Sequence, residues 1–301
     1  MKTILIALLL FAAVPANACI NESEPFEEEH RADYGQSPVE FLREQLDAQP
    51  SSKIVGPKSG QLISPDLDTE FVTSQHDAVS EIYSGNFKVA IEKLQALEAS
   101  HPNDYRTAAN LGTAYELIGD NKNALHWISE GIKRNEDSHH GTEWLHKQIL
   151  EAKIAMEIDP DYLKTNHILP IEKSVVRYTS SYADNLDRAL HYQLGERMLF
   201  VKPLDPVVAD LLYSFAIVEF QSGAPGAAIE LLKLAQEYGY LNSTDLDEKL
   251  AQYRIVLYKQ WAAKVIKIVV ACAFLVASYF VARFMVRRMN PAPITGDISG
   301  P

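Results

Sequence analysis

The chain has 301 residues and a formal net charge of −12. Such an acidic balance argues against nucleic acid as a partner, because nucleic-acid-binding proteins need a basic patch. The two cysteines, Cys19 and Cys272, cannot form a disulfide framework, and neither lies in a spacing typical of a metal site. The sequence also contains no Gly-rich phosphate loop, HExxH or GxSxG motif, so we expect no enzyme activity and no cofactor.

Residues 1–18 are predicted to be a signal peptide. Lys2 supplies a positive charge, residues 4–14 form an unbroken apolar run, and residues 16–18 match the small-x-small pattern before a cleavage site. The alternative is an uncleaved anchor, but this run of eleven apolar residues is too short to cross about 30 Å of hydrocarbon. Lipidation of Cys19 is a second alternative, although Ala stands three residues before it, where a lipobox prefers Leu.

Residues 19–67 are predicted to be an acidic, proline-containing linker without stable structure. A segment of this composition cannot bury enough apolar surface to offset the entropy lost on folding. Within it, residues 39–46 are compatible with one or two short helical turns. We interpret the acidic run as a solvated tail, with a docking role as the alternative.

Residues 68–257 are predicted to be an all-α domain that opens on a repeated pattern. Gly85 is followed by Ala90, and Gly119 by Ala124, so both features recur at a spacing of 34. The glycine permits a positive φ at the turn between two helices, and the alanine lets those helices cross closely. Here the chain resembles the tetratricopeptide-repeat (TPR) family. The resemblance implies a TPR-like α-solenoid of stacked helix–turn–helix units that binds other proteins.

The periodicity of apolar residues extends the helical prediction along the domain. A second repeat covers residues 105–135. Further single helices are predicted over residues 72–83, 88–100, 143–156, 187–201, 207–220 and 246–260. Gly223 followed by Ala228 repeats the glycine–alanine pattern late in the domain. We therefore expect two short blocks, 68–157 and 187–257, joined by an irregular crossover and stacked into one superhelix.

Residues 263–287 are predicted to be a transmembrane helix. Its central part, residues 265–286, has Lys267 and Arg283 near its ends and is long enough to span a membrane at about 1.5 Å rise per residue. Basic residues on the two sides are nearly equal in number and do not decide the orientation. The predicted signal peptide favours an orientation with the helical domain outside, and its compact form suggests a bacterial protein. We expect a single-pass inner-membrane protein with its repeat domain in the periplasm and a short tail, residues 288–301, in the cytoplasm.

The resemblance to TPR proteins also implies which side chains bind a partner, because the first helix of each repeat lines a concave groove. In the second repeat these side chains are Arg106, Asn110, Thr113 and Glu116. In the last full repeat they are Asp210, Tyr213, Ile217 and Phe220. For the two aromatic residues, packing against a neighbouring repeat is an equal alternative. Some family members hold a partner's C-terminal carboxylate with Lys and Asn, but this chain has Ala109 and Thr113 at those positions, so that activity is not carried over.

Residues 139–146, with the sequence His-His-Gly-Thr-Glu-Trp-Leu-His, contain the one candidate metal site. Glu143 and His146 share a helix face, and His140 could fold back towards them to complete a zinc site. The alternative, which we favour, is structural, with Thr142 capping the helix. We therefore expect no metal here.

The sequence favours a membrane-anchored scaffold that binds partner proteins in the periplasm or at the extracytoplasmic face. A structural or assembly subunit of an inner-membrane complex is the alternative, in which the transmembrane helix packs against other helices. The small residues that would allow such packing are Ala271, Ala273, Ala277 and Ser278. An enzyme built around His140, Glu143 and His146 is a third and distant alternative.

Overall fold

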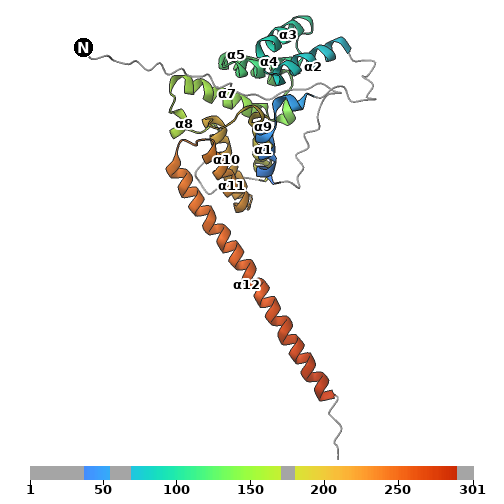
Figure 1. The fold of residues 1–301 in the computed structure, drawn as a ribbon, viewed down its shortest axis with the longest axis vertical. Helices are drawn as coiled ribbons and strands as arrows, with labels where there is room; N and C mark the ends of the chain where they lie inside the picture. The colour runs from blue at the N-terminus through green and yellow to red at the C-terminus, as the bar shows by residue number, and fades with distance from the viewer. Residues whose placement is uncertain (1–36, 55–68, 171–179, 290–301) are drawn as a thin grey trace, which may run out of the picture. The chain divides into compact units, whose positions relative to one another are not determined.

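The computed structural model describes residues 37–54, 69–170 and 180–289 (Figure 1). The regular secondary structure of these residues is entirely helical, which confirms the all-α prediction. The chain divides into two compact units, Met1–Ala251 and Gln252–Pro301. The predicted signal peptide and most of the C-terminal tail lie outside the described residues.

The helices follow one another with short connections. In chain order they are α1 (Pro38–Asp47), the 3-10 helix η1 (Pro50–Lys53), α2 (Thr69–Tyr83), α3 (Phe87–Ser100), α4 (Tyr105–Leu117), α5 (Asn121–Arg134), α6 (Ser138–Gly141), α7 (Glu143–Ile158), α8 (Tyr162–Thr165), α9 (Ser180–Phe200), α10 (Pro206–Gln221), α11 (Pro225–Glu237) and α12 (Ser243–Met289). Each helix predicted from apolar periodicity is present, with ends that differ by a few residues except in α9 and α12, which are longer.

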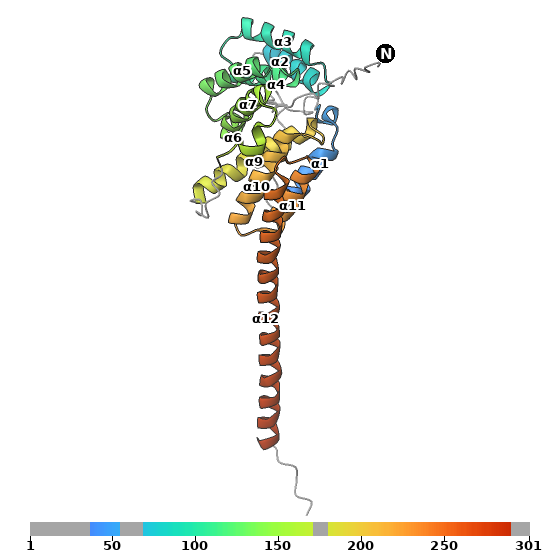
Figure 2. The ribbon, with the colours of Figure 1, turned by 90° about the vertical axis from the view of Figure 1, so that its left-hand side faces the viewer.

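Part of the predicted linker, residues 19–67, is folded. The backbone N–H of Ser37 donates to a carboxylate oxygen of Glu40 at 3.3 Å, as in half of a capping box, and α1 begins there. Leu42 on α1 is fully buried. Helix α1 packs beside α9 and α11 (Figure 2). The α1–α9 crossing is tight, because a Cβ atom on Gly195 would lie 2.7 Å from the ring of Phe41. The helical domain therefore begins well before the position expected from the sequence.

Three pairs of successive helices, α2/α3, α4/α5 and α10/α11, turn in the same way. Each turn contains a glycine with positive φ: Gly85 at 80°, Gly119 at 83° and Gly223 at 91°. In each turn the glycine donates its N–H to the carbonyl three residues earlier, and the next residue donates to the carbonyl five residues earlier. These two bonds are the Schellman motif, which satisfies carbonyl groups at the end of a helix. Gly239, between α11 and α12, repeats this geometry.

Small side chains set the spacing inside these helix pairs. Ala90, Ala124 and Ala228 are fully buried, as the glycine–alanine pattern predicts. In α4/α5 the approach is closer still, because a Cβ atom on Gly112 would lie 2.6 Å from the side chain of Ile128. A larger residue at either kind of position would force the two helices apart.

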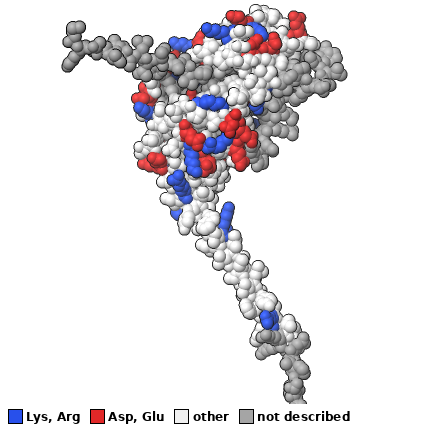
Figure 3. All heavy atoms as spheres, in the orientation of Figure 1, with Lys and Arg blue, Asp and Glu red and all other residues white. Residues whose placement is uncertain are grey.

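Among the described residues, one helix is long and apolar enough to cross a membrane, the stretch Ser243–Val286 of α12. Its large apolar side chains between Ile266 and Val286 are exposed in the structure, as expected of a surface that faces lipid. Figure 3 shows few charged side chains along this helix, in contrast to the many acidic and basic ones on the first unit. Length and composition thus agree with a single-pass membrane protein.

Candidate functional site

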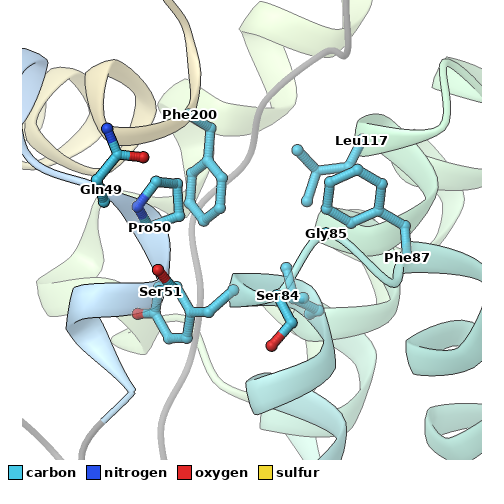
Figure 4. Close-up of a pocket in the computed structure, with 10 residues that line it drawn as sticks. Gln49, Pro50, Ser51, Ser84, Gly85, Phe87, Leu117 and Phe200 are labelled. Atoms are coloured by element: carbon cyan, nitrogen blue, oxygen red, sulfur yellow. The ribbon is translucent and has the colours of Figure 1, made fainter.

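An apolar cleft of about 320 Å³ lies in the first unit (Figure 4). Its lining comes from η1 and the residue before it, from the α2–α3 turn, and from the last residues of α4 and α9. The lining residues are Gln49, Pro50, Ser51, Ile82, Tyr83, Ser84, Gly85, Phe87, Leu117 and Phe200. None of these ten side chains is charged. The volume is at the low end of the range for ligand pockets, so the cleft suits bulky apolar side chains better than a large cofactor.

Aromatic rings form much of the cleft wall. Pro50 and Phe200 lie on one side of it, with Leu117 and Phe87 on the other (Figure 4). The rings of Tyr83 and Phe200 stack at 5.9 Å between centroids with an interplanar angle of 15°. Phe87 and Phe200 are only partly buried. Partly exposed aromatic side chains around a concave surface are typical of sites that bind other proteins.

Next to Leu117, Glu116 is the centre of a buried ionic cluster. Its carboxylate accepts hydrogen bonds from His146 Nε2 at 2.7 Å, from Lys153 Nζ at 2.8 Å and from Arg197 Nη1 at 2.7 Å. The carboxylate therefore links α4 to α7 and α9. Burial would raise the pKa of Glu116, but Arg197, Lys153 and His146 outweigh it and hold that pKa well below its usual value.

His146 also contacts a second buried carboxylate. Its Nδ1 lies 3.2 Å from Glu143 Oε2. Because ionised carboxylates only accept hydrogen bonds, both ring nitrogens of His146 must donate, and only the imidazolium form can do so. Burial would lower the pKa of His146, but Glu116 and Glu143 raise it above its ordinary value. The two carboxylates therefore favour the imidazolium form of this buried histidine.

The segment before α7 holds His139 beside this cluster. His139 Nδ1 lies 2.7 Å from Glu143 Oε1, although the angles do not fit a hydrogen bond. His139 and His140 have φ values of 50° and 56°, which non-glycine residues seldom adopt. The carbonyl of His139 accepts from Thr142 Oγ1 at 2.7 Å, and the ring of Tyr192 contacts both histidines. Thr142 thus bonds back to the turn, and no side-chain cap bond to α7 is formed.

The structure brings together two of the three residues of the candidate metal site. Glu143 and His146 share a face of α7 as predicted, but their partners are Glu116 and His139, and His140 is exposed. No group of three or more His, Cys, Asp or Glu residues in the described ranges is arranged to hold a metal ion.

The structure does not place the eight side chains predicted to bind a partner in an open groove. Three of them, Arg106, Ile217 and Phe220, are half-buried. The other five are buried: Asn110, Thr113, Glu116, Asp210 and Tyr213. Glu116 is covered by side chains of two other helices, His146 and Lys153 of α7 and Arg197 of α9. Arg106 pairs with Asp104 at 3.0 Å.

Tyr213 lies in a second polar cluster. Its ring stacks between His167, at 5.5 Å, and Tyr240, at 4.5 Å, and its hydroxyl donates to Asp245. Asp210, also predicted to face the groove, accepts from the backbone N–H of Ile168 at 2.8 Å and contacts His167 at 2.7 Å. These contacts hold α10 to the segment after α8 and to the start of α12.

No protein-family model, curated protein or solved structure matches this chain. The cleft and the ionic cluster are therefore interpreted from their own contacts. Sequence patterns did not indicate Phe200, Lys153 or Arg197, because each of them meets its partners across helices far apart in the chain. The one local signal was the spacing of three between Glu143 and His146.

Proposed function

We propose that the protein is an exported, membrane-anchored scaffold that binds partner proteins through the apolar cleft. In this proposal the helix pairs are TPR-like repeats of an α-solenoid. The recurring Schellman turns at Gly85, Gly119 and Gly223, and the spacing of 34 between the first two, support that assignment. TPR-like repeats commonly serve to bind other proteins, in agreement with the absence of catalytic motifs from the sequence.

The observation that carries the proposal is the chemistry of the cleft. Its wall is aromatic and aliphatic and its few polar groups are uncharged, so a charged ligand would lose its hydration without finding a partner. Its volume of about 320 Å³ leaves room for one or two large apolar side chains. The occupant we propose is a short segment of a partner protein that presents a bulky apolar side chain, as an anchor residue does in a groove.

The membrane anchor in this proposal is α12. Its length and exposed apolar surface support a single span, and a cleaved signal peptide would leave the repeat domain in the periplasm. The cytoplasmic side would then hold only the short C-terminal tail. Partners would be gathered at the outer surface of the inner membrane.

An assembly subunit that acts through its transmembrane helix is the second candidate. It is favoured by the exposed small residues Ala271, Ala273, Ala277 and Ser278 on α12, which permit close helix packing. Exchange of the span for an unrelated apolar helix separates the two functions. A scaffold keeps its partners after this exchange, whereas an assembly subunit loses them.

A charge in the cleft tests the scaffold function directly. Phe87→Asp places a carboxylate among the lining side chains, and we expect it to reduce recovery of the partner at least about 10-fold in a cross-linking pull-down from native membranes. Val89→Asp is the matched control, because Val89 lies on the same helix, is 42 % exposed and does not line the cleft. Equal recovery with both variants would show that the partner binds elsewhere.

A further inference from the structure

The ionic cluster and the cleft are built on the same two helix ends. Glu116 of the cluster and Leu117 of the cleft are consecutive residues of α4. Arg197 and Phe200 lie about one turn apart at the end of α9. The Glu116–Arg197 ion pair, at 2.7 Å, therefore holds together the helix ends that carry Leu117 and Phe200 on opposite sides of the cleft.

The protonation state of His146 determines which hydrogen bonds hold the carboxylate of Glu116. A neutral imidazole has one N–H and one lone pair, so it can donate to Glu116 or to Glu143 but not to both. The other nitrogen would then face a carboxylate oxygen, at 2.7 Å or at 3.2 Å, with two acceptors opposed. His146 and Glu116 have no exposed surface, so water does not relieve this repulsion.

In the carboxylate of Glu116, movement of one oxygen also moves the other. In Glu116, Oε2 accepts from His146, while Oε1 accepts from Lys153 and Arg197. The two oxygens belong to one rigid group. The neutral tautomer of His146 that keeps its proton on Nδ1, facing Glu143, has its lone pair on Nε2. Oε2 of Glu116 then turns away from the lone pair on Nε2, and Oε1 must also change its contact with Arg197.

His146 is surrounded by charged groups on several helices. Those that contact it or its carboxylate partners are Glu116 on α4, His139 on α6, Glu143 and Lys153 on α7, and Arg197 on α9. Glu196, next to Arg197, is also buried. The buried residues of α5, which packs on α7, are uncharged: Asn121, Ala124, Ile128 and Gly131. The buried residue of α8 is Leu163.

We propose that His146 is a proton-dependent latch that sets the width of the apolar cleft. When protonated, it keeps Glu116 in contact with Arg197 and so keeps Leu117 close to Phe200. When it loses the proton on Nε2, the end of α4 moves relative to α9 and the cleft widens. The latch would regulate the cleft that we propose as the partner-binding site. Its biological role rests on that proposed function, but the structural change itself does not.

The direction of the pH effect follows from the contacts of His146. Burial opposes its charge, yet Glu116 and Glu143 raise its pKa above the ordinary value of about 6.5. The stabilising contribution of a group with a raised pKa is complete below the pKa of the unfolded chain and is lost as pH rises through the pKa of the folded protein. The latch is therefore closed while His146 is protonated and opens as pH rises through its raised pKa.

Distance measurements between spin labels test the latch in the full chain in detergent micelles. Labels are placed on Ile118→Cys and Leu204→Cys, with Cys19 and Cys272 replaced by serine. Ile118 and Leu204 are 41 % and 73 % exposed and lie just beyond Leu117 and Phe200 in the sequence. Between about pH 6 and about pH 9 we expect the label-to-label distance to lengthen by a few ångströms and its distribution to broaden.

Two comparisons make the outcome decisive. In a His146→Gln background the distribution should already be long and broad at low pH and should not change further. A control pair at the exposed residues Glu70, in the first turn of α2, and Ser84, directly after its last residue, should keep one distance at both pH values. An unchanged Ile118–Leu204 distance in the native-sequence background overturns the proposal without any variant having to fold. An equal change with His146→Gln also overturns it. Because the readout needs no partner, failure of the partner-binding function leaves this test valid.

Discussion

Replacement of Glu116 by glutamine should lower the free energy of unfolding by about 3–5 kcal/mol, the range for breaking a buried ion pair by removing one partner. The variant leaves His146, Lys153 and Arg197 as buried cations around a neutral amide. The amide nitrogen can also face a donor, so a hydrogen bond is lost as well as a charge. Chemical denaturation followed by circular dichroism measures the effect.

The matched control is Glu151→Gln on α7. Glu151 pairs with Lys147 at 3.3 Å, but both side chains are about half exposed, at 50 % and 45 %. Exposed pairs of this kind contribute about 0–1 kcal/mol, so the control should unfold almost as the native protein does. If Glu116→Gln were as stable as Glu151→Gln, the cluster could not be what holds α4, α7 and α9 together.

Replacement of Leu42 by alanine should cost about 2–5 kcal/mol, the usual range for removing a fully buried leucine side chain. Leu42 has no exposed surface, although it lies in the segment that the sequence assigns to a linker. The cost arises from lost apolar contact and from the cavity left between α1 and the helices on which it packs. The thermal midpoint of unfolding measures it.

Glu44→Ala serves as the control for Leu42→Ala. Glu44 lies on the same helix and is exposed, so its replacement should change stability by less than about 0.5 kcal/mol. Equal stability of the Leu42→Ala and native proteins would show that α1 does not belong to the folded domain.

The elements that the sequence predicted well depend on local chemistry. The turn at Gly119 needs a residue that accepts positive φ, and Ala124 must be small where α4 and α5 cross, so both are visible in a short stretch of sequence. For α1 the sequence allowed one or two helical turns at residues 39–46 but did not predict that they pack in the domain, for the opposite reason. Its acidic, proline-containing surroundings resemble a linker, and it is buried by α9, which follows about 150 residues later in the chain.

In the candidate site, too, the sequence predicted the local features and not those that depend on distant residues. Glu143 and His146 lie three apart on one helix, so the sequence could place them on a common face. Their principal partner, Glu116, comes from α4, and it was predicted to face an open groove. Glu116 does not face a groove, because side chains of α7 and α9 bury it, and Lys153 and Arg197 neutralise its charge. No local pattern in the sequence predicts that these helices bury Glu116.

Photo-cross-linking from inside the cleft tests the partner-binding function most directly. A benzophenone amino acid at Ser84, which is exposed and lines the cleft, should capture one protein in native membranes. The same group at Ile158, which is 85 % exposed and does not line the cleft, should not capture that protein. Addition of Phe87→Asp should abolish the Ser84 product. A Ser84 probe that captures nothing, or that captures the same proteins with and without Phe87→Asp, would contradict a partner bound in this cleft.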